Sequence, residues 1–517
     1  MISKKRNFSS RIVLCAGLAL SLASLAQAQP IFQSTFPGYG GNDAARGGVL
    51  LTKDGGTISV GESQTFSPTG TYDVYVVKTD ECGFLQWSAT YDFGGSDFGR
   101  KIRATEDGGY IIVGTTDRTT CCDEKSSSAD IFLLKIDENG NVNWGKTYGG
   151  VGYDEGTDVQ LHPFGGFTVT GNTQSFGDGK INGYLQRTDD NGNILWGRSY
   201  GVRDGADFFN GCTVTAKGDI LVVGTTHSFG GTHILALRTD PDGYINPTGW
   251  AAFYPSKGAG NGRSIIETSD ETFVIAGGLI TTQTGTLDGY LLRIDGAGTA
   301  LFDQAFAEAN GQFGDELAEV RETFDGHLIF TGYMTDAPNG FGGRDLLLGE
   351  VDYKFNPQWY SLHGDKLDDE GYSLAFSREL SKERGGIFVT ANGVTQNFTK
   401  QGEDLYLIQA VQGGKSGCHD TYPKVKDFRP ELQGKYVEYC HPLVRVQCFA
   451  KVGVEFHKDQ NLLCTSCKHD GLQQENGNDP NLGQVDHDIQ KNGLHSAATR
   501  VETIQVKGRT EMVRGTR

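Results

Sequence analysis

Seven acidic or amide side chains recur at one position of a repeated segment, and they are the first candidates for chemistry. Each follows a glycine-rich stretch and precedes a strand-like run. Hard cations prefer carboxylate oxygens, so a ring of these groups at a channel mouth could bind a cation or a basic group. The same side chains could instead cap their own turns or tie neighbouring units together by accepting backbone N–H bonds. The seven residues are Asp43, Asp97, Asp154, Asp207, Asn261, Asp315 and Asp369.

A second group of acidic motifs resembles the start of a calcium-binding loop. The motifs are "DENGN" from Asp137, "DDNGN" from Asp189 and "DPDGY" from Asp240. They lack the remaining ligands and the distal Glu of such a loop. A hairpin turn with a left-handed glycine explains them without a cation. We therefore predict no cofactor, with calcium as the alternative.

No motif in the chain singles out a catalytic centre. The sequence contains neither Gly-x-Ser-x-Gly nor His-Glu-x-x-His. A glycosidase needs two carboxylates at a set separation, and 64 acidic residues offer too many pairs to choose among. The histidines of the repeats fall at unrelated positions. We predict no catalytic residue and no metal centre.

The elements that would position these residues are internal repeats. Asp92–Tyr148 and Gly149–Tyr200 share a glycine-rich start with an Asp, then four strand-like runs separated by turns. A marker such as "YVVKTD" or "FLLKID" ends the third run, and its Asp recurs every 51 to 57 residues. All five tryptophans fall at or near the fourth run. Such units predict four-stranded β-sheets.

The predicted fold is all-β, a seven-bladed β-propeller closed by the N-terminal strand. Four strands in about 50 residues make one propeller blade, with a β-solenoid as the alternative. The seventh repeat lacks its fourth strand, and "IFQSTFPGYGGND" at the start aligns with "LQWSATYDFGGSD", which puts Phe32 at the Trp87 position. We expect this N-terminal strand to pair with "DLYLIQAV" and to close the ring.

The repeats resemble a known group of exported proteins. The pattern T-x-D-G-G-Y-I-x-x-G, seen in "TEDGGYIIVG" from Thr105, is similar to that of exported β-propeller proteins of Bacteroidota-type bacteria. The resemblance covers about residues 30–414. It implies the propeller fold and a secreted or surface protein, and it implies little about function.

The regions flanking the repeats have other compositions. Residues 1–28 have the basic, apolar and small-residue regions of a signal peptide. Residues 29–414 form the propeller, 415–469 a small Cys-rich β segment, and 470–517 a flexible polar tail. "YVEYCHPLVRVQCFAKVGVEF" alternates like a β-hairpin. Export favours disulfides over zinc for the cysteines. The disulfide candidates are Cys418, Cys440, Cys448, Cys464 and Cys467.

The net charge and the long loops limit which functions and partners are expected. A formal net charge of −18 makes nucleic acid an unlikely partner, and no segment beyond the signal approaches the length of a membrane span.

Long, divergent loops between second and third strands are expected on one face, where binding usually resides. We predict a secreted or cell-surface protein, with the periplasm as the alternative. We predict that it acts as a non-catalytic binding or scaffold module for a protein or glycan at the cell envelope. The alternatives are a polysaccharide hydrolase or lyase, and a component of a surface assembly docked by its C-terminal segment.

Overall fold

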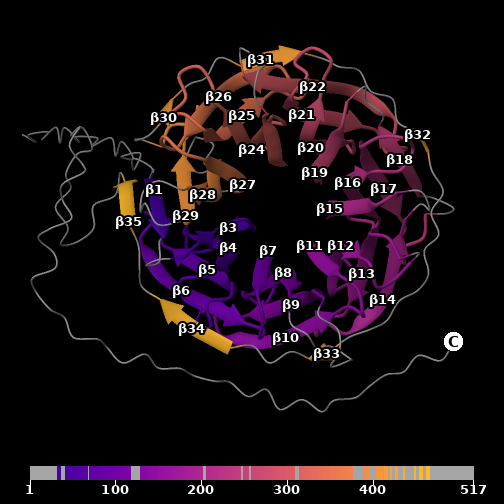
Figure 1. Cartoon of the computed structure of the whole chain (residues 1–517), viewed down its shortest axis with the longest axis vertical. Helices are drawn as coiled ribbons and strands as arrows, with labels where there is room; N and C mark the ends of the chain where they lie inside the picture. Colours follow the sequence, from indigo (N-terminus) through magenta and orange to yellow (C-terminus); the bar gives the residue numbers. More distant parts are fainter. Residues whose placement is uncertain are drawn as a thin grey trace, which may run out of the picture.

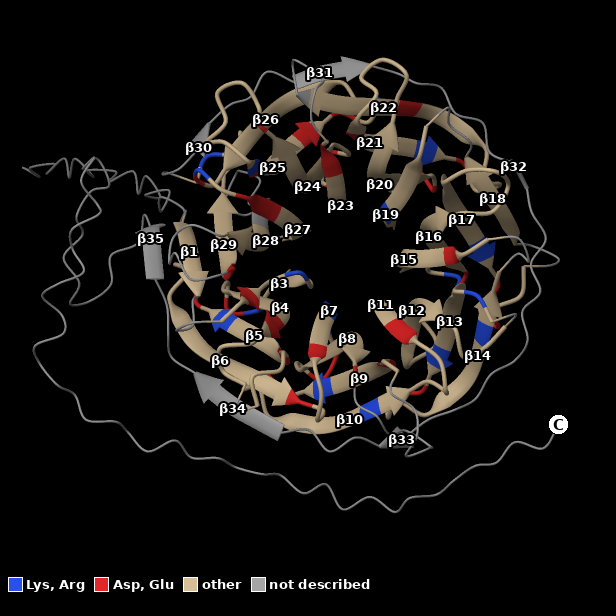
Figure 2. Ribbon diagram, in the orientation of Figure 1, with Lys and Arg blue, Asp and Glu red and all other residues tan. Residues whose placement is uncertain are grey.

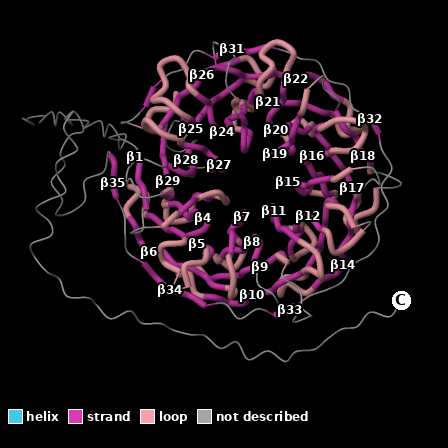
Figure 3. The backbone as a smooth tube through the Cα atoms, in the orientation of Figure 1, coloured by secondary structure: helices cyan, strands magenta, loops and turns pink. Residues whose placement is uncertain are grey.

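The repeats fold into seven antiparallel β-sheets that stand side by side around a central axis (Figure 1). The computed structural model describes residues 32–36, 41–67, 69–117, 128–177, 179–201, 205–245, 249–254, 258–308, 314–376, 389–395, 403–411 and 413–416. It also describes the backbone of six short strands between 420 and 465. The predicted signal peptide 1–28 and tail 470–517 lie outside the described residues. The described part of the chain consists of strands and loops (Figure 3), and none of it is a helix long and apolar enough to cross a membrane.

Blades 1 to 4 follow one another along the chain. Blade 1 contains β2 (Asp43–Ala44), β3 (Val49–Leu51), β4 (Thr57–Ser63), β5 (Asp73–Thr79) and β6 (Leu85–Asp92). Blade 2 contains β7 (Asp97–Ala104), β8 (Tyr110–Thr116), β9 (Asp130–Ile136) and β10 (Val142–Tyr148). Blade 3 contains β11 (Asp154–Leu161), β12 (Phe167–Thr173), β13 (Asn182–Thr188) and β14 (Ile194–Tyr200). Blade 4 contains β15 (Asp207–Val214), β16 (Ile220–Thr226), β17 (His233–Thr239) and β18 (Trp250–Tyr254).

Blades 5 to 7 complete the ring. Blade 5 contains β19 (Gly260–Glu267), β20 (Phe273–Ile280), β21 (Leu287–Ile294) and β22 (Ala300–Glu308). Blade 6 contains β23 (Glu316–Glu322), β24 (Leu328–Thr335), β25 (Arg344–Val351) and β26 (Pro357–His363). Blade 7 contains β27 (Asp369–Ala375), β28 (Val389–Thr395), β29 (Asp404–Ala410) and β1 (Phe32–Phe36). The predicted seven-bladed propeller is therefore confirmed.

The hydrophobic core lies between the blades. The two middle strands of a blade are buried along their whole length, as in "YIIVGTT" of β8 and "DIFLLKI" of β9. Their apolar side chains pack against the neighbouring sheet, so that Val60 and Val76 of blade 1 share one cluster with Ile112 and Phe132 of blade 2. Each sheet thus buries both faces, which a single four-stranded sheet cannot do alone.

A repeated aromatic contact joins each blade to the next. The Trp or Phe near the start of every fourth strand lies on the hairpin turn of the following blade, where a residue with positive φ allows the ring to approach the backbone. A Cβ added at Gly192 would come within 2.8 Å of the Trp144 ring. The glycine pairs are Phe32 with Gly83, Trp87 with Gly140, Trp144 with Gly192, Trp196 with Gly243, Trp250 with Gly298, and Trp359 with Gly414. Blade 5 uses Phe302 against Phe355, whose ring centroids lie 4.9 Å apart.

The N-terminal strand closes the ring as predicted. β1 pairs antiparallel with β29, and its residues Phe32 and Phe36 align with Gln409 and Leu405. All five residues of β1 are buried. Phe32 occupies the tryptophan position of blade 7 and packs on Gly83 of blade 1, so the first strand of the ring makes the same contact as the other six.

The C-terminal segment runs around the outside of the ring in the reverse direction. Its strands are β30 (Asp420–Thr421), β31 (Val425–Phe428), β32 (Lys435–Tyr436), β33 (Cys448–Phe449), β34 (Gly453–His457) and β35 (Asn461–Thr465). They pair in that order with the outermost strands of blades 6, 5, 4, 2, 1 and 7 (Figure 1). We call these six strands the rim strands. None of the described rim strands pairs with β14 of blade 3.

The rim strands correct one sequence-based expectation. The hairpin predicted within residues 436–456 is wrong for the strands described there, because β33 pairs with β10 and β34 pairs with β6. Alternation of apolar and polar residues identifies a strand but not its partner. The rim strands instead cover the outer edges of six blades, which would otherwise present unpaired backbone groups.

Replacement of Phe32 by Ala should destabilise the propeller strongly. The Phe32 side chain is fully buried and makes the contact between blades 7 and 1 that closes the propeller. We therefore expect a loss of about 3 to 5 kcal/mol in the free energy of unfolding. Phe324→Ala is the control, because this side chain is 49% exposed and its loss should change stability by less than about 0.5 kcal/mol. Urea denaturation measures both. Equal stability of the two variants would contradict closure by β1.

Truncation after Ser416 should lower the melting temperature by several degrees and increase light scattering at concentrations where the full chain stays clear. The reason is that the outer edges of six blades lose their partner strands. Truncation after residue 469 is the control, because it retains every rim strand. Unchanged melting of the shorter protein would show that the rim strands do not stabilise the ring.

Candidate functional site

The seven residues predicted to ring the channel mouth lie at or next to the starts of the inner strands. Six are fully buried or nearly so, with exposed fractions of 0–1% for Asp43, Asp97, Asp154, Asp207, Asp315 and Asp369. Their backbone N–H groups bond to the preceding blade at several of these positions, for example Asp97 N to Tyr72 O and Asp154 N to Ala129 O. None of the seven lines the central cavity described below.

Their polar atoms hold the blade-to-blade connections. Asp97 Oδ2 accepts the Phe93 N–H at 2.6 Å, and Asp369 Oδ2 accepts the Asp365 N–H at 2.7 Å. Asp315 Oδ1 accepts the Thr335 N–H at 2.9 Å, and Asn261 Oδ1 accepts the Gly278 N–H at 2.7 Å. Each of these oxygen atoms thus accepts a bond from its own connection or from the strand that follows, and Asn261 Nδ2 also donates to Glu316 of blade 6 at 2.6 Å, as the capping and tying alternative in the sequence suggested.

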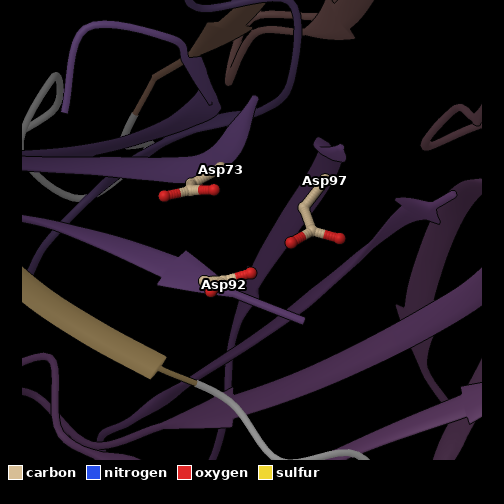
Figure 4. A group of neighbouring side chains, drawn as sticks. All are labelled: Asp73, Asp92 and Asp97. Atoms are coloured by element: carbon tan, nitrogen blue, oxygen red, sulfur yellow. The ribbon is translucent and has the colours of Figure 1, made fainter. Parts of the chain in front are cut away.

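Carboxyl groups nevertheless meet at the blade boundaries. Asp73, Asp92 and Asp97 offer oxygen atoms that all lie within 4.8 Å of one another, and Figure 4 shows their side chains directed toward a common space. Burial, with Asp92 and Asp73 close by, raises the pKa of Asp97 to about 8. The three carboxyls can therefore share a proton, and they are also the group among the described residues that could hold a hard cation.

The same pairing occurs elsewhere in the ring. Burial, together with Asp154, raises the pKa of Asp130 to about 7. Burial likewise raises the pKa of Asp345 to about 7 and that of Asp369 to about 8. Blade 3 has Asn182 at the position of Asp130, so one boundary already uses a neutral side chain.

The residues that do face the channel are presented by a β-bulge in the inner strands of blades 2 to 7 and by the gap between β2 and β3 in blade 1. The register of the inner strand against its neighbour shifts by one residue directly after the third position, for example between Gly99 and Lys101 and between Gly156 and Asp158. A bulge bends the strand and turns the extra side chain away from the sheet. The extra residues, with Arg46 in the gap between β2 and β3, are Arg46, Arg100, Thr157, Asn210, Arg263, Ala318 and Tyr372.

All seven of these residues line a central cavity of about 590 Å³. The cavity walls are mainly polar, and Figure 2 shows basic and acidic residues together around the opening. Its basic side chains are Arg46, Arg100, Lys101, Arg103, Arg263, Arg321 and Arg344. Its carboxylates are Glu155, Asp158, Glu316, Glu319 and Glu370. Glu62 and Glu403, which do not line the cavity, pair with Arg46, and Glu62 also lies 4.0 Å from Arg100, so basic and acidic side chains around the cavity are about equal in number.

One side of the cavity holds a cluster of arginines and tyrosines. Arg263 Nε and Nη2 donate to Glu316 at 2.6 and 3.2 Å, and the Arg344 guanidinium pairs with Glu370. The Arg344 guanidinium carbon lies 4.6 Å from the centre of the Tyr333 ring. Tyr372 donates its hydroxyl hydrogen to Glu370. We call Arg46, Arg263, Arg344, Tyr333 and Tyr372 the Arg–Tyr cluster.

A second set of ion pairs spans the channel. Lys101 of blade 2 reaches Glu319 of blade 6 at 2.9 Å, and Arg321 also pairs with Glu319. Burial alone would raise the pKa of Glu319, but Arg321, Lys101 and Arg103 lower it to about 2. Glu319 is therefore ionised near neutral pH and cannot donate a proton there.

The remaining candidates from the sequence are the aspartates of the hairpin turns and the cysteines. The Asp137 and Asp189 carboxylates accept backbone N–H bonds of their own turns, for example from Asn141 at 2.8 Å and from Asn193 at 2.7 Å. The predicted left-handed glycines are confirmed, with φ of 84° at Gly140 and 73° at Gly192. Cys418, Cys440 and Cys467 lie outside the described residues, and only the backbone of Cys448 and Cys464 is described, so their pairing stays a prediction.

The Arg–Tyr cluster was missed in the sequence because its members do not share a residue type. A signal that could have revealed three of its members, Arg46, Arg263 and Tyr372, is the position three residues after the repeated Asp, or after Gly260 in the fifth repeat, where Arg, Thr, Asn, Ala and Tyr replace one another. The surrounding positions stay similar, since they serve the same contact in every blade. Variation at a single repeat position marks a place that the fold leaves free.

The paired carboxyls predict how stability depends on pH. The folded chain binds the protons of Asp97, Asp130, Asp345 and Asp369 more tightly than the unfolded chain, whose Asp pKa is about 3.9. Their stabilisation is complete below about pH 4 and is lost as the pH rises through 7 to 8. Glu319 acts in the opposite sense, and only below about pH 4.

Asp97→Asn should therefore reduce the fall in free energy of unfolding between about pH 5 and pH 8. Asp242→Asn, the same change at an exposed site, is the control and should leave the fall unchanged. Urea denaturation across the pH range measures the effect. A variant that loses stability as steeply as the parent would show that Asp97 does not hold a proton in the folded state.

Comparison with known proteins identifies no family. No protein-family model matches the sequence, and no curated protein matches it either. A protein of unknown function from Dyadobacter fermentans DSM 18053 is similar in structure, at 10% identity and a TM-score of 0.41 over 73% of this chain and 97% of its own. The subtype N11 neuraminidase-like protein of A/flat-faced bat/Peru/033/2010 (H18N11) has 10% identity and a TM-score of 0.38 over 75% and 98%. Sqt1 from Chaetomium thermophilum has 11% identity and a TM-score of 0.37 over 75% and 90%. Likeness this distant carries no functional argument.

Proposed function

We propose that this protein is an exported, non-catalytic binding or scaffold module that recognises a protein or glycan at the cell envelope. The long-loop face carries the connections between second and third strands and the connections between blades. The cavity reaches this face, because Tyr333 and Arg344 line the cavity and flank the loop 336–343 between β24 and β25. Ligand would be held by that loop and by the cavity walls.

The observation that carries the proposal is the broken symmetry of the bulge positions. Structural positions repeat around the ring: an aromatic ring lies on the next turn in all seven blades. The bulge positions instead present five residue types to one cavity, with Arg at three of the seven positions. A purely structural channel has no need of this variety, whereas a binding site requires differing groups at defined places.

The chemistry of the cavity favours binding over catalysis. Glu319 is ionised by its three cationic neighbours, and Glu316 and Glu370 are paired with arginines. Burial, with Glu316 nearby, raises the pKa of Tyr333 to about 12, so its phenol stays neutral. These groups are suited to hydrogen bonding and charge recognition, while a general acid near neutral pH needs a carboxyl that retains its proton.

Replacement of loop 336–343 by a Gly-Ser linker of equal length should weaken ligand binding by at least about tenfold. The mature chain is first screened against glycan and protein libraries, and the affinity for each hit is then measured by biolayer interferometry. Glu106→Ala, in an exposed turn on the opposite face, is the control and should bind like the parent.

Two other outcomes would replace the proposal. Release of sugar from a polysaccharide that stops in Glu370→Gln would assign a hydrolase or lyase. Binding that survives the loop replacement but disappears on truncation after Ser416 would favour docking through the C-terminal segment. Absence of any bound protein or glycan would contradict all of these functions.

A further inference from the structure

The Arg–Tyr cluster has the features of a site for one anionic group. Three guanidiniums from three blades, those of Arg46, Arg263 and Arg344, lie in one wall of the cavity. The side chains of Arg263 and Arg344 are 47% and 43% exposed, although both are ion-paired. They therefore face cavity space and remain within reach of a ligand.

Donor groups of these arginines remain for a ligand. A guanidinium carries five N–H groups in a planar fork. Arg263 uses Nε and Nη2 toward Glu316, and Arg344 uses Nη1 toward Glu370. Nη1 of Arg263 and Nη2 of Arg344 make no bond within the described residues. Bonds already made fix the orientation of each guanidinium, so little conformational freedom would be lost when a ligand binds.

The arginine donors that remain unbonded set the sign of the ligand. Seven basic side chains and five carboxylates line the cavity, and Glu62 and Glu403 pair with Arg46 from outside the lining, so the formal charges around it balance. Arginine is the preferred partner of planar carboxylates, which it contacts with two parallel hydrogen bonds. An anionic group would therefore be recognised by directed hydrogen bonds from Arg263 and Arg344 and not by a net positive charge of the cavity.

The other residues that line the cavity indicate which kind of molecule carries the anionic group. Tyr333 and Tyr372 add aromatic rings to the cavity lining, and such rings suit the apolar face of a sugar. One face of Tyr333 is covered by the Arg344 guanidinium, and the Tyr372 hydroxyl already donates to Glu370, so it is the remaining ring surface that would contact the sugar. Thr157, Asn210 and Gln160 add neutral donors and acceptors across the cavity. At about 590 Å³ the cavity has the size of a small-molecule site and not of a protein surface.

We infer that the Arg–Tyr cluster binds a carboxylate-bearing sugar residue, with Arg263 and Arg344 holding the carboxylate and the tyrosines contacting the ring. This inference rests on the proposed binding function and specifies its ligand. An acidic peptide would use the same arginines but would gain nothing from the aromatic rings of Tyr333 and Tyr372.

The test compares two trisaccharides by isothermal titration calorimetry with the mature chain. Trigalacturonate should bind at least about tenfold more tightly than a neutral galactose trisaccharide, and this advantage should shrink in about 0.5 M salt. Equal affinity for the two sugars would overturn the inference while leaving a glycan-binding function intact. Tighter binding of a glutamate tripeptide than of trigalacturonate would also overturn it.

Variants locate the site. Arg263→Gln and Arg344→Gln should each weaken trigalacturonate binding by about tenfold or more, because each removes a charged donor. Arg238→Gln is the matched control, since Arg238 pairs with Asp219 away from the cavity and its loss should not change the affinity. The double variant Arg344→Gln/Glu370→Gln removes both partners of one ion pair. It therefore leaves no unpaired carboxylate, and it should still lose affinity while it melts like the parent. Unchanged affinity in this folded variant would refute the assigned role of Arg344.

Discussion

The contact of a fourth-strand aromatic ring with the hairpin turn of the next blade is the interaction on which the ring depends. It occurs at all seven boundaries, including the one closed by Phe32. Four of the boundaries add a tyrosine hydroxyl that donates to the same turn carbonyl, for example Tyr148 to Gly192 O at 2.8 Å. Because the aromatic side chain packs flat on the backbone of the turn, the turn residue has positive φ, which glycine adopts at least cost.

This repeated contact leaves the inner end of each blade less constrained. The core and the aromatic contact bury the middle and outer strands, whereas the inner strand borders the cavity. A bulge there removes one residue from the ladder without disturbing the neighbouring sheet. The fold can therefore vary the bulge residue freely, and Arg46, Arg263 and Tyr372 come to share a cavity although no repeat predicts their combination.

Much of the architecture could be predicted because its physical causes are local and repeated. The Asp-Gly turns, the buried "FLLKID"-type strands and the tryptophan positions each recur with a period that only a blade explains. Even the closure by Phe32 followed from counting fourth strands. The partners of the rim strands could not be predicted, since a short strand such as Val425–Phe428 fits any open edge, and its pairing with β22 depends on where the chain leaves blade 7.

The sequence by itself determined the seven blades and the closing strand, because each of these results from a pattern visible in the repeats. Only the tertiary structure decided that the repeated aspartates turn into the blade boundaries and not to the channel mouth, and that the bulge residues turn into the cavity. The reason is that the bulge after Gly99 takes Arg100 out of the ladder and toward the cavity, whereas Asp97 stays paired in the buried part of the strand. The varied residues at this repeat position can be read in the sequence, but their meeting in one cavity becomes visible only when the seven inner strands stand around one axis.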